Sequence, residues 1–120
     1  IRGLVDDIVL VSEAQLESAV SLLLQIEKTV VEGAGAAGLA AVMANPDLFR
    51  GNNVGIVLCG GNIDTRLLAN VLLRDLARSG RLARLRITLQ DRPGALYKVM
   101  KLFNEHNVNI IEIYHQRIFT

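Results

Sequence analysis

The residues with the clearest chemical potential lie in one short stretch around Cys59, the single cysteine of the chain. Cys59 follows the apolar run Val54–Leu58, which has the pattern of a strand covered on both faces. Gly60 and Gly61 permit backbone conformations and close approaches that a side chain would block. Asp64 is placed to open a helix, where free N–H groups attract negative charge. Strand, small-residue turn and helix is the arrangement that α/β proteins use at ligand sites.

Cys59 is interpreted either as a nucleophile activated by a helix N-terminus or as a small residue at a buried strand end. A nucleophile needs an acid and a base, and the chain offers no clear candidates. His106 and His115 do not have metal-pair spacing with Cys59 and are expected at the surface. The lysines fall at polar helical positions, unlike a desolvated amine nucleophile: Lys28, Lys98 and Lys101. The sequence therefore predicts no catalytic residue and no metal site in this chain.

The composition excludes several classes of protein. Half of the 120 residues are hydrophobic (51%), which indicates a globular chain. A formal net charge of +1 argues against binding to nucleic acid through phosphate contacts. A single cysteine excludes an internal disulfide and fits a reducing, cytoplasmic setting. No apolar run approaches the roughly 20 residues of a membrane helix, and no signal-peptide pattern is visible. The chain begins at Ile1, in strand-like sequence, which suggests an internal piece of a longer protein.

The first 80 residues predict two strands and three helices, in the order β-α-α-β-α. A strand at 7–11 precedes Ser12 and Gln15, which have the spacing of a capping box and start a helix. The apolar stripe of that helix is Leu16, Ala19, Val20, Leu23 and Ile26, and its expected solvent side includes Glu17, Gln25 and Lys28.

The second predicted helix, Glu32–Met43, is rich in small residues. Gly33, Gly35 and Gly38 should each weaken it by about 1 kcal/mol relative to Ala, so a flat group or another backbone is expected against its start. The third helix is capped by Asp64 and carries Arg74 and Arg78 near its C-terminus, where the dipole favours cations; Gly80 suits the C′ position.

The pattern changes after residue 80. Residues 83–90 alternate strictly between apolar and polar, which is typical of a strand with one face in solvent. The turn Asp91–Gly94 leads into a helix with Pro93 at its first position and Asn107 at its end, and a strand at 108–119 follows. The sequence thus predicts an α/β fold with two parts, residues 1–80 and a β-α-β part at residues 81–120.

Three motifs in the first part together resemble one enzyme family. Val5–Ser12 (VDDIVLVS), Val31–Ala36 (VEGAGA) and Leu58–Asp64 (LCGGNID), in this order, are similar to the C-terminal third of the catalytic domain of threonine dehydratase, or threonine ammonia-lyase. That family belongs to the fold-type II pyridoxal phosphate enzymes, with serine racemase as a close relative. Residues 81–120, with Asp91–Leu96 and Asn107–Ile110, resemble the first half of a ferredoxin-like ACT regulatory domain.

The resemblance gives Cys59 a role beside a cofactor. Its position matches the Ser, Thr or Cys that meets the pyridine nitrogen of pyridoxal phosphate, and a neutral partner there leaves the ring unprotonated. The other cofactor-binding residues that the resemblance implies are Gly60, Gly61, Asn62 and Gly33. The family's cofactor-anchoring lysine and phosphate loop have no counterpart in this sequence, so we expect this chain alone to be inactive.

For the parent protein, the resemblance implies conversion of L-threonine to 2-oxobutanoate and ammonia in the cytoplasm. A serine racemase or serine-preferring dehydratase is the alternative within the same enzyme class. A non-catalytic amino-acid sensor or oligomerisation module is the alternative from another class.

The ACT resemblance implies a small amino acid as effector, bound at a turn and often across a dimer interface. The matching residues are Asp91, Arg92, Pro93, Gly94, Ala95, Leu96 and Asn109. A homo-oligomer is therefore expected, with strand exchange through the incomplete ACT half as one route to it. No nucleic-acid or membrane partner is expected.

Overall fold

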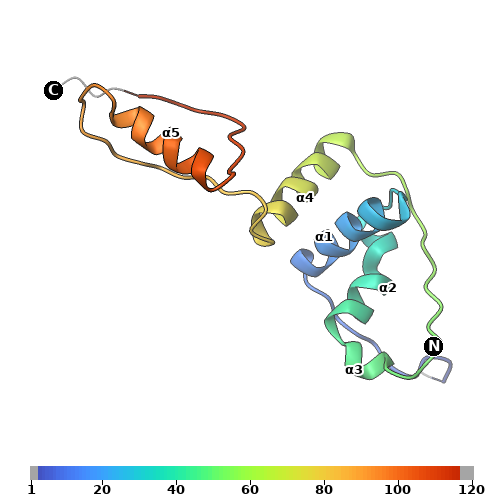
Figure 1. The fold of residues 1–120 in the computed structure, drawn as a ribbon. Helices are drawn as coiled ribbons and strands as arrows, with labels where there is room; N and C mark the ends of the chain where they lie inside the picture. Colours follow the sequence, from blue (N-terminus) through green and yellow to red (C-terminus); the bar gives the residue numbers. More distant parts are fainter. Residues whose placement is uncertain (1–2, 117–120) are drawn as a thin grey trace. The chain divides into compact units, whose positions relative to one another are not determined.

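The structure is a computed structural model that describes residues 3–116. This range contains the helices α1 to α5 and one short π-helix, joined by extended segments (Figure 1). The chain divides into two compact units, which we name unit 1 (Ile1–Ala83) and unit 2 (Arg84–Thr120). No described helix is both long and apolar enough to cross a membrane.

The α/β fold expected from the sequence, including the incomplete ferredoxin-like βαβ, is wrong for the described residues. Residues 3–116 contain no β-strand, although the runs at 7–11, 54–58, 83–90 and 108–116 lie outside the helices. An apolar or alternating run favours an extended backbone, but a strand also needs a neighbour that exchanges N–H and C=O bonds with it. These runs have no such neighbour here. Positions 117–119 of the last predicted strand lie outside the described residues.

The first helix, α1 (Glu13–Leu22), begins as predicted. The Ser12 side chain accepts the N–H of Gln15 at 3.3 Å, and the Gln15 side chain accepts the N–H of Ser12 at 2.7 Å. The helix continues as the π-helix η1 (Leu23–Glu27), which ends at Lys28 in the left-handed conformation with φ 55°. A π-turn holds more residues per turn and rotates the side chains that follow it. Ile26, predicted within the apolar stripe, is accordingly 64% exposed.

Helix α2 (Gly33–Ala44) follows the short segment after η1, and α3 (Pro46–Phe49) is a single turn directly behind it. Asn45 separates the two, and its amide and backbone N–H both donate to the carbonyl of Ala41. The predicted stop at Asn45-Pro46 is therefore confirmed, since proline cannot continue the backbone hydrogen bonding of α2.

Helix α4 (Thr65–Arg78) has both of its predicted ends. The Asp64 carboxylate accepts the N–H of Leu67 at 2.9 Å, as an N-cap residue does. Gly80, at φ 72°, donates its N–H to the carbonyl of Ala77 at 3.2 Å. This is the left-handed closure that glycine adopts without strain at the end of a helix.

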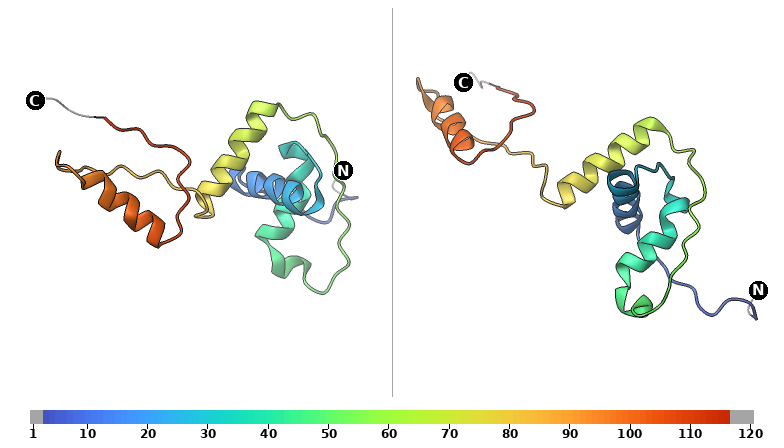
Figure 2. Two further views of the ribbon diagram at one scale, coloured as in Figure 1. Left: turned by 45° about the horizontal axis from the view of Figure 1, so that its top comes forward. Right: turned by 45° about the vertical axis from the view of Figure 1, so that its right-hand side comes forward.

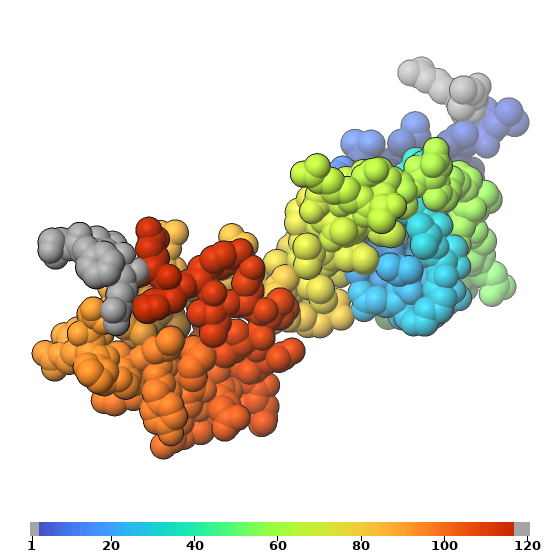
Figure 3. All heavy atoms as spheres, turned by 90° about the horizontal axis from the view of Figure 1, so that it is seen from above, coloured from blue at the N-terminus to red at the C-terminus, as the bar shows by residue number. Residues whose placement is uncertain are grey.

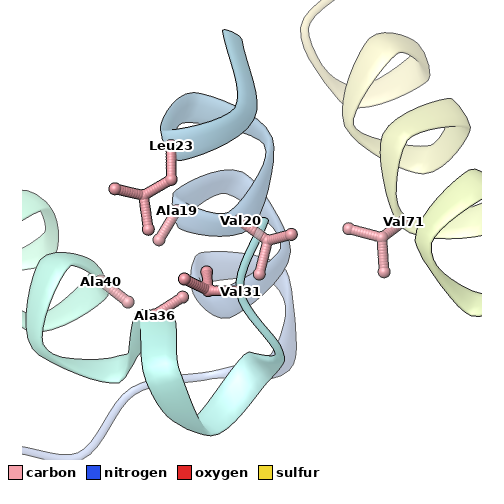
Figure 4. Close-up of a cluster of buried hydrophobic side chains, with 7 residues drawn as sticks. All are labelled: Ala19, Val20, Leu23, Val31, Ala36, Ala40 and Val71. Atoms are coloured by element: carbon pink, nitrogen blue, oxygen red, sulfur yellow. The ribbon is translucent and has the colours of Figure 1, made fainter. Parts of the chain in front are cut away.

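The core of unit 1 lies where α1 packs between α2 and α4 (Figures 1, 2 and 4). Val71 of α4 faces Val20 of α1 on one side, and the α2 alanines approach α1 on the other (Figure 4). The small α2 side chains allow the two helices to approach closely. The buried apolar residues are Ala19, Val20, Leu23, Val31, Ala36, Ala40 and Val71.

Unit 2 is built around α5 (Ala95–Glu105). Pro93 was predicted as the first helical residue, but Gly94 lies at φ 82° as the N-cap residue and the helix starts at Ala95, two residues after Pro93, so that prediction is wrong. The predicted stop is confirmed, because Asn107 lies at φ 53° and the N–H of Val108 returns to the carbonyl of Phe103 at 2.9 Å.

Candidate functional site

The segment from Cys59 to Asp64 forms an accessible turn at the start of α4, and we name it the 59–64 turn. It ends the long extended segment that joins α3 to α4 (Figures 1 and 2). Gly60 lies at φ 77°, a conformation that L side chains rarely adopt. The residues Cys59, Gly61 and Asn62 are exposed. The turn therefore presents one thiol and little other side-chain bulk.

The start of α2 packs directly against this turn. A side chain at Gly35 would collide with the carbonyl of Cys59, and one at Gly38 would come within 2.8 Å of the Ile56 side chain. The N–H of Glu32 donates to the carbonyl of Gly60 at 2.8 Å. The prediction that the small residues of α2 admit another backbone is thus confirmed.

Glu32 also places its side chain on the turn. Its carboxylate and Cγ are the atoms that a side chain at Gly60 would meet, with Cδ at 2.7 Å and Cγ at 2.9 Å. Glu32 precedes α2, where the helix N-terminus favours a carboxylate. Glu32 was not among the cofactor-binding residues predicted from the sequence.

The predicted cofactor-binding residues therefore divide into two groups. Cys59, Gly60, Gly61 and Asn62 are consecutive on the turn, and a side chain at Gly61 would lie 3.3 Å from the carbonyl of Val30. Gly33 opens α2, and a side chain there would meet nothing within 4 Å. The close contact with the turn belongs instead to Gly35, which sequence reasoning could have selected only by knowing which face of α2 the turn covers.

The basic groups of the chain are engaged or exposed elsewhere. The Lys28 ammonium donates to the carbonyl of Gln25 at 2.6 Å, and Lys101 lies 3.7 Å from the Glu105 carboxylate. His106 and His115 are exposed, as expected. Over residues 3–116, no group of three or more His, Cys, Asp and Glu side chains is arranged to hold a metal ion.

The predicted effector-binding residues lie in unit 2. Residues 91–94 form a turn that leads into α5. Gly94 is the N-cap residue of this helix, and Ala95 and Leu96 are its first two residues. Asn109 is exposed in the extended segment after α5. At the far end of that segment, a hydrogen bond to Glu112 and some desolvation raise the pKa of Tyr114, while the charge of Arg84 lowers it.

An ion pair between a buried carboxylate and two partly exposed arginines joins α1 to α4, and it was not predicted from the sequence. Glu17, assigned to the solvent side, is only 4% exposed. Its Oε1 accepts from Nε of Arg74 at 2.6 Å, and its Oε2 accepts from Arg78. The signal available in the sequence was the spacing of the two arginines, which places both on one helical face.

The neighbouring positions form a second bond between the same helices. The Ser18 hydroxyl donates to Oδ1 of Asp75 at 2.9 Å, and Asp75 also lies 3.6 Å from Arg81. Burial raises the pKa of Glu17, but the hydrogen bonds and charges of Arg74 and Arg78 outweigh it, so the pKa lies below its usual value. The bond to Glu17 likewise raises the pKa of Arg74.

Comparison with known proteins gives clear relatives in sequence. The chain is 37% identical over 117 residues to the L-threonine ammonia-lyase of Thermotoga maritima and 40% identical over 117 residues to that of Geobacter sulfurreducens. Each match covers 98% of this chain and 29% of the relative. The serine racemase of Arabidopsis thaliana is 45% identical over 71 residues, which cover 53% of this chain.

No protein-family model and no solved structure matches the chain. The two long matches include nearly all of both units, since they extend over 98% of the chain. The chain spans less than a third of the length of these relatives. Over that span, its sequence is similar to those of threonine dehydratases (threonine ammonia-lyases).

Proposed function

We propose that this chain is part of a pyridoxal phosphate-dependent threonine ammonia-lyase, which converts L-threonine to 2-oxobutanoate and ammonia. One observation carries the proposal: identity of 37% and 40% to two L-threonine ammonia-lyases along 98% of the chain. The proposed setting is the cytoplasm, in keeping with a single, unpaired cysteine.

The 59–64 turn fits one edge of a planar pyridine-type ring. The Cys59 thiol is accessible, and Gly61 and Asn62 beside it are exposed. The glycine at position 60 gives less support for a ring-binding site. Its positive φ and the neighbouring Glu32 side chain already require a residue without Cβ there. The fit therefore rests on the exposed thiol and on the low bulk next to it.

Bound pyridoxal phosphate supplies the electron sink for loss of a proton from Cα and of the hydroxyl from Cβ of the substrate. Cys59 would hold the ring nitrogen by a neutral hydrogen bond, with no carboxylate that favours a proton there. A thiol is a weak partner, so this contact would orient the ring more than it changes its charge. Gly60 and Gly61 would let the backbone pass close to the ring, and Asn62 would help to fix the turn.

The test uses the full-length gene product that carries this chain, purified and supplied with pyridoxal phosphate. With L-threonine, we expect formation of 2-oxobutanoate and ammonia in equal amounts, because each threonine yields one molecule of each. The water lost in the elimination is taken up again in the hydrolysis that releases ammonia. The 2-oxoacid is quantified as its dinitrophenylhydrazone. A folded, cofactor-loaded protein that forms no 2-oxoacid from threonine would contradict the proposal.

A serine racemase activity is the competing assignment. The Arabidopsis thaliana racemase matches 53% of this chain at 45% identity, so the chain is similar to both kinds of enzyme and the substrate assay separates them. The same preparation should be given L-serine, with D-serine measured by chiral chromatography and pyruvate as the dinitrophenylhydrazone. Faster formation of D-serine than of 2-oxobutanoate would replace the proposed function by racemisation.

A regulatory role for unit 2 is a second proposal. Its support is that the two long ammonia-lyase matches extend through unit 2. A small amino acid would bind at the bend of residues 91–96, with Asn109 as a further candidate. Calorimetric titration of the full-length gene product with isoleucine, valine and serine tests this, and Arg92→Ala should weaken any saturable binding. Flat titrations with all three amino acids would remove the proposal.

A further inference from the structure

Helix α4 is attached to α1 at two kinds of contact. Val71 packs in the buried core, opposite Val20 of α1 (Figure 4). One helical turn further on, Glu17 of α1 accepts hydrogen bonds from Arg74 and Arg78. The atoms of α4 lie directly against those of α1 in the space-filling view (Figure 3).

The polar contacts fix the register of the two helices. Consecutive residues of α1 bond consecutive residues of α4, since Glu17 meets Arg74 and Ser18 meets Asp75. Arg78 adds a second contact to Glu17 one turn later. Apolar contacts tolerate rotation and sliding, whereas paired hydrogen bonds from two arginines to one carboxylate are directional. The ion pair therefore sets the angle at which α4 lies on α1.

The other end of α4 is the 59–64 turn. Asp64 caps the helix, so the turn and the helix move together. An α-helix of 14 residues behaves as a stiff rod, and its direction at Arg74 determines where its first residue lies. On its opposite side, the turn meets α2 through the Glu32 N–H and the surface of Gly35.

We infer that Glu17, through Arg74 and Arg78, is a positioning residue that holds the 59–64 turn against α2 and so sets the place of Cys59. Glu17 lies in α1, far from the turn in sequence, and its carboxylate acts through α4. The consequence for pyridoxal phosphate rests on the proposed function. The consequence for the turn itself does not.

The experiment compares the wild-type full-length gene product with Glu17→Gln and with Arg74→Gln, a milder change at a half-exposed side chain that leaves Arg78 in place. The first readout is hydrogen exchange in the cofactor-free protein, followed by mass spectrometry of peptides covering residues 59–68. We expect exchange there to become about tenfold faster in Glu17→Gln and to rise less in Arg74→Gln. The second readout is the dissociation constant of pyridoxal phosphate, which should rise in the same order.

Ala40→Gly is the matched control. It destabilises unit 1 from the C-terminal half of α2 and leaves every hydrogen bond of Glu17, Arg74 and Arg78 in place. At denaturant concentrations that equalise overall stability, this control should leave exchange at residues 59–68 within about twofold of wild type.

Two outcomes overturn the inference. One is equal exchange at residues 59–68 in Ala40→Gly and in the two ion-pair variants, which would make Glu17 a contributor to overall stability only. The other is hydrogen exchange at residues 59–68 that stays at the wild-type rate in both Arg74→Gln and a folded Glu17→Gln. If the wild type binds no pyridoxal phosphate, the proposed function fails while the exchange result still decides the role of Glu17.

Discussion

Two glycines at the start of α2 have opposite surroundings although they are two residues apart. A side chain at Gly35 would overlap with the carbonyl oxygen of Cys59, whereas one at Gly33 would meet nothing within 4 Å. We expect Gly35→Ala to cost about 1–3 kcal/mol of unfolding free energy, because backbone must shift. Gly33→Ala should be neutral or stabilise by up to about 1 kcal/mol. Urea unfolding followed by circular dichroism measures both, and equal effects would contradict the packing of α2 on the turn.

Gly60 has two reasons to be glycine, and Gly80 has one. Both have positive φ, 77° and 72°, but only Gly60 also faces a neighbouring side chain, that of Glu32. Gly80→Ala should therefore show the conformational cost alone, about 1–2 kcal/mol. Gly60→Ala should cost more, and Glu32→Ala in the same chain should recover the difference. A double-mutant cycle on unfolding free energies tests this; a zero interaction between positions 32 and 60 would refute it.

Two substitutions of Cys59 test whether its thiol is a hydrogen-bond partner of the cofactor ring or a nucleophile. In the full-length gene product, Cys59→Ser should keep ammonia-lyase activity, since a hydroxyl also forms a neutral hydrogen bond to the ring nitrogen. Cys59→Asp should lower activity, because a carboxylate favours a proton on that nitrogen. Steady-state formation of 2-oxobutanoate is measured at saturating cofactor. Loss of turnover in Cys59→Ser with cofactor still bound would restore the nucleophile interpretation.

At the scale of the helices, four of the caps were readable in the sequence, but the solvent-facing side of each helix was not. Ser12, Asp64, Gly80 and Asn107 all act as predicted, because caps depend on residues within four positions of one another. Glu17 was misplaced because its partners lie 57 and 61 positions away. Hydrophobic periodicity treats a carboxylate as solvent-facing and has no information on a distant arginine.

The ion pair between α1 and α4 should give stability a specific pH dependence. The pKa of Glu17 in the folded chain lies below its usual value of 4.5. The stabilisation of the folded state by the ionised Glu17 is therefore complete above that value and is lost as the pH falls through the folded pKa. The charged groups that face it are Arg74 and Arg78, with Glu13 near Arg74.

We therefore expect the unfolding free energy of the wild type to fall more steeply than that of Glu17→Gln as the pH is lowered below 4.5. At neutral pH, Glu17→Gln should cost about 1–3 kcal/mol, since the arginines lose a buried charged acceptor. Denaturant titrations at several pH values measure both effects. Asp47→Asn, which removes an exposed pair with Arg50, is the control and should change neither. Parallel pH profiles in wild type and Glu17→Gln would contradict the assignment.

For the whole molecule, the exposed apolar surface is the main departure from an ordinary small domain. Val57 is 83% exposed, and the described extended runs have no paired strand. The chain matches less than a third of the length of its ammonia-lyase relatives. We expect such runs to be covered when partner strands or chains are available, because unpaired backbone and apolar side chains together favour association.

The absence of a desolvated lysine in this chain leads to a prediction about the 120-residue chain by itself. Lys28 and Lys101 are engaged at the surface, and Lys98 is exposed on α5. Mixed with one equivalent of pyridoxal phosphate and reduced with borohydride, the chain should carry no stoichiometric adduct and should release no 2-oxobutanoate from threonine. Intact-mass and peptide spectrometry detect the adduct. A single fully modified lysine would show that the chain holds its own cofactor anchor.

The sequence by itself indicated the resemblance to threonine dehydratases, the 59–64 turn and the helix caps at Ser12, Asp64, Gly80 and Asn107, because these depend on local motifs and on residues a few positions apart. Only the tertiary structure decided that Gly35 rather than Gly33 meets the turn, that Glu32 covers Gly60, and that Glu17 is buried between two arginines. It also replaced the expected strands by unpaired extended segments in residues 3–116. The physical reason is common to all of these: a backbone contact, a buried charge and a β-ladder each need a partner distant in the chain, and local sequence pattern cannot supply it.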